Sequence, residues 1–114
     1  MATILIADDE TLIRALLKTV LLKAGHSIYE ASNGLEAVAI FRSYANDIDL
    51  VVMDMMMPVM NGAQAIERIR ETRPEVRVIC ISGYSDTEIP RGRFLQKPFD
   101  LKVFTSLVAE ILAD

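Results

Sequence analysis

The residues best suited to chemistry in this chain of 114 residues are acidic, and they follow short apolar runs. Asp8 and Asp9 come directly after Thr3–Ala7, and Asp54 comes directly after Leu50–Met53. Three carboxylates placed together repel one another and stay ionised only when a cation neutralises them. Mg²⁺ suits such a group, because it takes one or two carboxylates together with waters and phosphate oxygens. The acidic residues therefore predict a magnesium site.

Two further polar residues follow apolar runs in the same way. Ser82 comes after Val76–Ile81, and Lys97 comes after Phe94–Gln96. A hydroxyl and an ammonium group are both suited to holding phosphoryl oxygens. Together with the carboxylates, they predict a site of phosphoryl transfer in which a carboxylate can itself be the nucleophile.

The simpler alternative is that these residues are helix caps and solvated loop residues. Asp8 or Asp9 could cap a helix that begins near Thr11, because aspartate is a favoured N-cap. Capping explains any one of these aspartates on its own. It does not explain why five polar groups all stand at the ends of predicted strands, and we therefore favour the functional interpretation.

The elements that must position these residues are strands and helices in alternation. Apolar runs that predict strands alternate with segments whose apolar residues recur at helical spacing. Asn33-Gly34 predicts a turn after the second strand, and Pro58 suits the first turn of the third helix. This pattern predicts a parallel sheet with helices on both faces, and ligands bind such sheets at the carboxyl ends of the strands. The predicted strands are Thr3–Ala7, Ser27–Ala31, Leu50–Met53, Val76–Ile81 and Phe94–Gln96.

Composition limits the class of protein. With 52% hydrophobic and 25% charged residues, residues 1–114 are expected to form a single compact domain. The net charge of −4 argues against direct nucleic-acid binding, and no apolar run is long enough to span a membrane. The single cysteine, Cys80, has no internal disulfide partner, and the start of the chain shows no secretory signal, so we expect a cytoplasmic protein.

The motifs around these residues resemble the receiver domains of response regulators in two-component signalling. The resemblance implies a flavodoxin-like, doubly wound sheet of five parallel strands in the order 2-1-3-4-5. It also implies a signalling domain, not an enzyme, which catalyses only its own phosphorylation and dephosphorylation. The matching segments span essentially the whole chain: Ile6-Ala7-Asp8-Asp9-Glu10, Asp54 with Met57–Gly62, Ser82-Gly83 and Lys97-Pro98-Phe99.

The resemblance assigns the phosphoacceptor and the metal ligands. Asp54 would accept the phosphoryl group from a histidine kinase or a histidine phosphotransfer protein. Mg²⁺ would be bound directly by Asp9, Asp54 and the backbone carbonyl of Met56, and through water by Asp8.

The resemblance also implies how the domain switches. Lys97 would pair with the phosphoryl group, and its peptide bond to Pro98 is expected to be cis. Ser82 would move toward the phosphoryl oxygens, and the space behind it would be filled by Phe94, the switching aromatic residue. The modified domain would then act on a downstream protein target.

One segment departs from the family pattern. Only residues 83–93 separate Ser82 from Phe94, which predicts a shortened or missing fourth helix. Because family members often dimerise through that helix, we expect a monomer or a weak dimer. The short segment, followed by Phe94–Phe99, resembles receivers attached to hybrid sensor kinases and indicates a phosphorelay role.

Two other functions remain alternatives. A small Mg²⁺-dependent phosphatase-type enzyme also uses an aspartyl nucleophile, but it needs a cap over its substrate, and 114 residues leave no room for one. A flavodoxin-like cofactor binder needs a phosphate-binding loop after the first strand, where this chain has acidic residues that would repel a phosphate.

Overall fold

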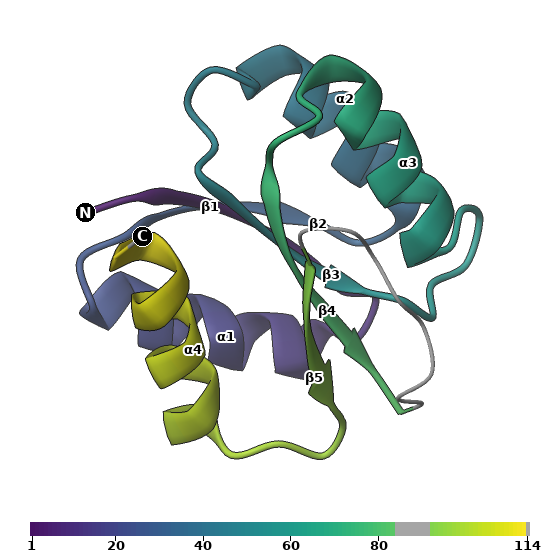
Figure 1. Ribbon diagram of the computed structural model, residues 1–114. Coiled ribbons are helices and arrows are strands. Elements are labelled where there is room, and N and C mark those ends of the chain that lie inside the picture. Colours follow the sequence, from purple (N-terminus) through teal and green to yellow (C-terminus); the bar gives the residue numbers. More distant parts are fainter. Residues whose placement is uncertain (84–91, 114) are drawn as a thin grey trace.

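The structure is a computed structural model that describes residues 1–83 and 92–113. Five parallel strands form one sheet in the order β2-β1-β3-β4-β5 (Figure 1). The strands are β1 (Thr3–Ala7), β2 (Ser27–Ala31), β3 (Leu50–Asp54), β4 (Arg77–Ser82) and β5 (Gly92–Gln96). The helices of the described residues are α1 (Thr11–Lys23), α2 (Gly34–Tyr44), α3 (Gly62–Thr72) and α4 (Leu101–Ala113).

The helices cover both faces of the sheet. In Figure 1, α2 and α3 lie on one face, and α1 and α4 lie on the other. Side chains alternate between faces along a strand, so Leu5 of β1 packs in the core layer under α2 and α3, and Ile4 and Ile6 pack in the layer under α1 and α4. Phe41 and Phe104 are the largest buried side chains of the two layers, and burial of each contributes about 1.5–3 kcal/mol.

The order of the strands creates the place for a site. The chain adds β2 on one side of β1 and then β3 on the other side, so strand order reverses between β1 and β3. Ligands bind doubly wound sheets outside the carboxyl ends of the strands at this reversal. All five residues of β3 are buried, and its last residue is Asp54. The predicted fold and strand order are thus confirmed.

Two local predictions were wrong, both at helix starts. Asn33-Gly34 does not form a turn after β2: Asn33 is the N-cap of α2, and its side chain accepts a hydrogen bond from the backbone N–H of Glu36 at 2.8 Å. Pro58 does not lie in a helix, because α3 begins at Gly62. Asn61 caps α3 through a reciprocal capping box with Gln64, and this cap sets the start of the helix.

The remaining differences concern strand ends and the connection before β5. The strand β3 extends one residue further than predicted, β4 lies one residue later, and β5 begins at Gly92, before Phe94. The predicted shortened fourth helix falls in residues 84–91, which lie outside the described residues. Across the described ranges, no helix has both the length and the apolar character needed to cross a membrane.

The apolar stripe of α1 is only partly covered. The helix buries Leu17 and Leu21 against the sheet. Leu12 and Leu16 lie on the same helix but remain 80% and 53% exposed. Leu16 lines an apolar hollow with Pro98, which lies in the loop between β5 and α4, so this side of the molecule presents apolar surface beside the carboxyl ends of the strands.

Candidate functional site

Asp54 stands at the centre of the site. It is only 2% exposed, and its Oδ1 accepts a hydrogen bond from the backbone N–H of Met56 at 3.0 Å. Its Oδ2 lies 3.3 Å from Nζ of Lys97. The chain returns close to Asp54 at Gly62: a Cβ atom at Gly62 would lie only 2.6 Å from the Asp54 carbonyl oxygen. Glycine at the start of α3 therefore lets the helix pack against the acceptor residue.

Asp8 is fixed beside it at the end of β1. The Asp8 backbone N–H donates to the carbonyl of Ala31 on β2 at 3.1 Å, and its own carbonyl accepts from Arg14 of α1 at 2.7 Å. Arg14 is in turn paired with Glu30 of β2 at 3.2 Å. The Asp8 side chain accepts at Oδ1 from the Glu10 backbone N–H at 2.8 Å. The Asp8 backbone is thus held by β2 and α1.

The second carboxylate oxygen of Asp8 has no hydrogen-bond partner although the residue is 1% exposed. Burial raises the pKa of Asp8 from 3.8 to about 6; the hydrogen bond from Glu10 opposes this rise, and the charge of Asp54 adds to it. This oxygen makes no hydrogen bond and lies 3.9 Å from the ammonium group of Lys97, so a closer cation would lower the cost of burying its charge.

A hard cation fits this environment. Carboxylate oxygens of Asp8, Glu10 and Asp54 all lie within 4.8 Å of one another. Oxygen ligands of this kind, with one oxygen left unsatisfied in the protein, match the preference of Mg²⁺. The chemistry of this cluster suits a hard cation, but its members differ from the metal ligands that the resemblance implies, because Glu10 belongs to it and Asp9 does not.

Lys97 supplies the positive charge of the site. Its Nζ lies 3.0 Å from Glu10, 3.3 Å from Asp54 and 3.9 Å from Asp8. Burial lowers the pKa of Lys97, but the hydrogen bond to Glu10 and the charges of the two aspartates outweigh it, so the pKa lies above the ordinary 10.5. The ammonium group stays charged at neutral pH and offsets part of the negative charge.

The backbone around Lys97 is positioned by β4. Its N–H donates to the Ser82 carbonyl at 2.8 Å, and the bond from Lys97 to Pro98 is cis, as expected. Ser82 is buried at the last position of β4. Phe94 pairs with Cys80 in the register of β4 and β5, so Phe94 and Ser82 face the same side of the sheet.

The site that the structure assembles differs in one member from the set that the resemblance implied. Asp8, Asp54 and Lys97 come together, with Ser82 and the Met56 backbone beside them. Asp9 is exposed and lies outside the cluster of carboxylates, whereas Glu10 belongs to it. Sequence reasoning did not assign Glu10 a role, although it stands next to the two aspartates.

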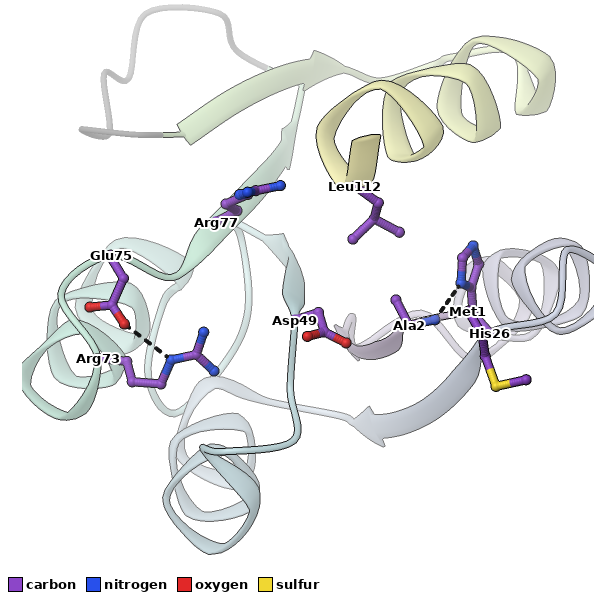
Figure 2. A pocket seen from close by; sticks show the side chains of 8 residues that line it. All are labelled: Met1, Ala2, His26, Asp49, Arg73, Glu75, Arg77 and Leu112. Atoms are coloured by element: carbon purple, nitrogen blue, oxygen red, sulfur yellow. Dashed lines mark hydrogen bonds and ion pairs between the residues drawn. The ribbon is translucent and has the colours of Figure 1, made fainter. Parts of the chain in front are cut away.

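A second polar hollow lies at the opposite end of the sheet (Figure 2). Polar side chains of this hollow make hydrogen bonds to the backbone: His26 accepts from the Ala2 N–H at 3.1 Å, and Asp49 accepts from the Thr3 N–H at 2.9 Å. Arg77 donates to the carbonyl of Ile111 near the end of α4. These contacts tie strand starts and the last helix together, so we assign this hollow a structural role.

Comparison with known proteins identifies the family. The sequence profile of the response regulator receiver domain matches residues 4–109. The chain belongs to this receiver family. Receiver domains act as signalling domains in two-component systems and phosphorelays, and they are not enzymes in the usual sense.

Individual relatives agree with this assignment. The sensor kinase CckA of Brucella abortus is 34% identical to this receiver over 118 residues, which cover 97% of the chain but 12% of that kinase. The solved receiver domain of the hybrid histidine kinase CckA has a TM-score of 0.88 and 32% identity, covering 97% of this chain and 99% of that one. The response regulator TrrA of Thermotoga maritima, solved in complex with Mg²⁺ and BeF, has a TM-score of 0.83 and 30% identity over 97% of this chain and 99% of its own.

Proposed function

We propose that this receiver accepts a phosphoryl group on Asp54 from a phosphohistidine of a histidine kinase or a histidine phosphotransfer protein. The observation that carries the proposal is the placement of Asp54 at the end of β3, 2% exposed and 3.3 Å from the ammonium group of Lys97. A carboxylate held in this way is an aligned nucleophile with its counter-charge already in place. Residues 1–114 would act as one domain.

The transfer is a single displacement at phosphorus. An Asp54 carboxylate oxygen forms the new P–O bond, the P–N bond to the donor histidine breaks, and its electron pair leaves with the imidazole. Lys97 offsets the charge of the phosphoryl oxygens throughout. As the resemblance implies, Mg²⁺ would be held by Asp9, Asp54 and the Met56 carbonyl, with Asp8 acting through water, and this requires the exposed Asp9 side chain to turn toward the cluster of carboxylates. When bound, it would neutralise charge on the transferred group.

Phosphorylation would then change the packing of the domain. An acyl phosphate adds close to two negative charges and three acceptor oxygens next to Lys97. The buried hydroxyl of Ser82 would turn toward these oxygens, and Phe94, on the same side of the sheet, would fill the space that Ser82 leaves. The new surface would be presented to a downstream protein, and we place this reaction in the cytoplasm.

The hybrid-kinase character is also part of the proposal. The relative CckA is a sensor kinase, and the similar solved receiver comes from a hybrid histidine kinase. Both support a role in a phosphorelay for this chain. In a phosphorelay, the receiver exchanges its phosphoryl group with a histidine phosphotransfer protein, so such a protein is the partner to test first.

The proposal is tested by intact mass after incubation with acetyl phosphate, with and without Mg²⁺. We expect one base-labile phosphoryl adduct on the native chain that requires Mg²⁺ and is absent from Asp54→Asn. The matched control is Asp47→Asn, since Asp47 is an exposed aspartate away from the site. An adduct that survives in Asp54→Asn would disprove the assignment of the acceptor. If acetyl phosphate and a phosphorylated histidine donor both fail on the native chain, the proposed function is wrong.

A further inference from the structure

Glu10 occupies a position where glutamate does not serve the helix. It is the N-cap of α1, yet its side chain makes no capping hydrogen bond. The N-caps of α2 and α3 are Asn33 and Asn61, and both cap through their side chains. Asparagine, aspartate, serine and threonine are the preferred residues at such positions. The first turn of α1 therefore lacks a stabilising contact that the chain provides elsewhere.

The Glu10 carboxylate is directed instead at Lys97, which is distant in sequence. Its Oε1 lies 3.0 Å from Nζ of Lys97, closer than Asp54 at 3.3 Å. The side chain of Glu10 is 56% exposed, whereas those of Lys97 and Asp54 are 22% and 2% exposed. Glu10 thus holds the ammonium group from the solvent side, and Asp54 holds it from the interior.

We propose that Glu10 is a positioning residue that retains Lys97 in the unphosphorylated domain and competes with the phosphoryl group for it. This inference rests on the proposed function of Asp54. Once phosphoryl oxygens are attached to Asp54, Lys97 exchanges Glu10 for them, and Glu10 is left as an unpaired anion beside a more negative site. Glu10 therefore opposes phosphorylation and favours the unmodified state.

The size of the effect follows from the exposure of Glu10. Ion pairs with an exposed partner contribute modestly, because water and salt screen them. Neutralising Glu10 should therefore change the phosphorylation rate by about two- to fivefold, not by orders of magnitude. The effect should also shrink at high salt, because the pair is open to solvent on one side.

The first experiment measures the rate of Asp54 phosphorylation by acetyl phosphate at saturating Mg²⁺. We expect Glu10→Gln to react about two to five times faster than the native chain, and Glu10→Asp, which keeps the charge, to lie closer to it. The control is Glu71→Gln, which removes the same charge from an exposed position on α3. An unchanged or slower reaction of Glu10→Gln would overturn the proposal.

The second experiment tests the pairing without any phosphodonor or metal. A double-mutant cycle of Glu10→Gln and Lys97→Met, followed by urea unfolding, should show non-additive changes in the unfolding constant of about two- to fivefold. Additivity would overturn the pairing even when the native chain is phosphorylated normally. Non-additivity in a chain that never takes up phosphate would retain the pairing and refute the proposed function.

The third experiment separates positioning of Lys97 from metal binding. The carboxylate of Glu10 also lies within 4.8 Å of those of Asp8 and Asp54, which a metal ligand would require. Direct titration with Mg²⁺ should give Glu10→Gln an affinity within about twofold of the native chain. A loss of tenfold or more would show that Glu10 binds the metal, and the proposal would be wrong.

Discussion

Replacing Asp8 by asparagine should stabilise the metal-free domain. Asparagine has nearly the same shape and keeps an Oδ1 acceptor for the Glu10 N–H, but it removes a buried carboxylate in which one oxygen makes no hydrogen bond. Burial raises the pKa of Asp8 from 3.8 to about 6, and one pKa unit corresponds to about 1.4 kcal/mol. Keeping Asp8 ionised at pH 7 therefore costs the fold about 3 kcal/mol.

The pH dependence follows from the same shift. Because the folded pKa is raised, the folded state binds the Asp8 proton more tightly than the unfolded chain does. The penalty is therefore absent below about pH 3.8 and complete above about pH 6. Asp8→Asn should gain stability over the native chain as the pH rises through this window, and should show little difference at pH 3.5.

The assay is thermal unfolding in EDTA at several pH values, repeated in Mg²⁺. At pH 7 without metal, a gain of about 3 kcal/mol corresponds to a rise in Tm on the order of 10 °C. Added Mg²⁺ should stabilise the native chain, because it binds only the folded state, and should stabilise Asp8→Asn less. A variant that melts at or below the native Tm in EDTA at pH 7 would refute the reasoning that burial of this carboxylate is costly.

Three further changes test other parts of the structure. Gly62→Ala should destabilise the domain by about 1–3 kcal/mol and slow phosphorylation, because a Cβ atom at this position would lie 2.6 Å from the Asp54 carbonyl oxygen. Urea unfolding and intact mass after incubation with acetyl phosphate measure the two effects. Gly83→Ala is the control, because a Cβ atom there would meet open space. Phe104→Ala should lower the unfolding free energy by about 3–5 kcal/mol in urea, because the side chain is fully buried. Burial and the positive amino terminus lower the pKa of His26 below 6.5, so the neutral form stabilises the fold above that pH and this contribution is lost as the pH falls. Between pH 7.5 and 5.5 the native chain should therefore lose more stability in urea than His26→Asn does; equal losses would contradict this.

Much of the fold was predictable because its signals are local. The run of β1 ends at the acidic Asp8, β2 lies between His26 and Ser32, and the predicted limits of both strands agree with the structure. Helix starts were less predictable. At Asn33 and Asn61 the side chain caps a helix, but asparagine is equally common in turns, and only the following helix decides between the two.

The candidate site was predictable in outline and not in detail. Asp8, Asp54 and Lys97 follow strands, and parallel strands place such residues at one edge of the sheet. The direction of the first turn of α1 decides whether the side chain of Asp9 or that of Glu10 approaches the carboxylates of Asp8 and Asp54. That direction is set by packing of the helix against the sheet, for which no short sequence motif exists, and so the contact between Glu10 and Lys97 was not foreseen.

The two ends of the sheet also determine how the domain can be joined to other polypeptides. Met1, Ala2 and Leu112 line the hollow at the starts of the strands (Figure 2), whereas Asp54 is the last residue of β3, at the carboxyl ends of the strands. A strand of five residues at about 3.3 Å per residue separates the two by roughly 15 Å. Met1 and Leu112 thus both lie on the side of the sheet remote from the carboxylates. Segments joined near Met1 and Leu112 would therefore begin about one strand length away from Asp54, on the side of the sheet that does not carry the phosphoacceptor.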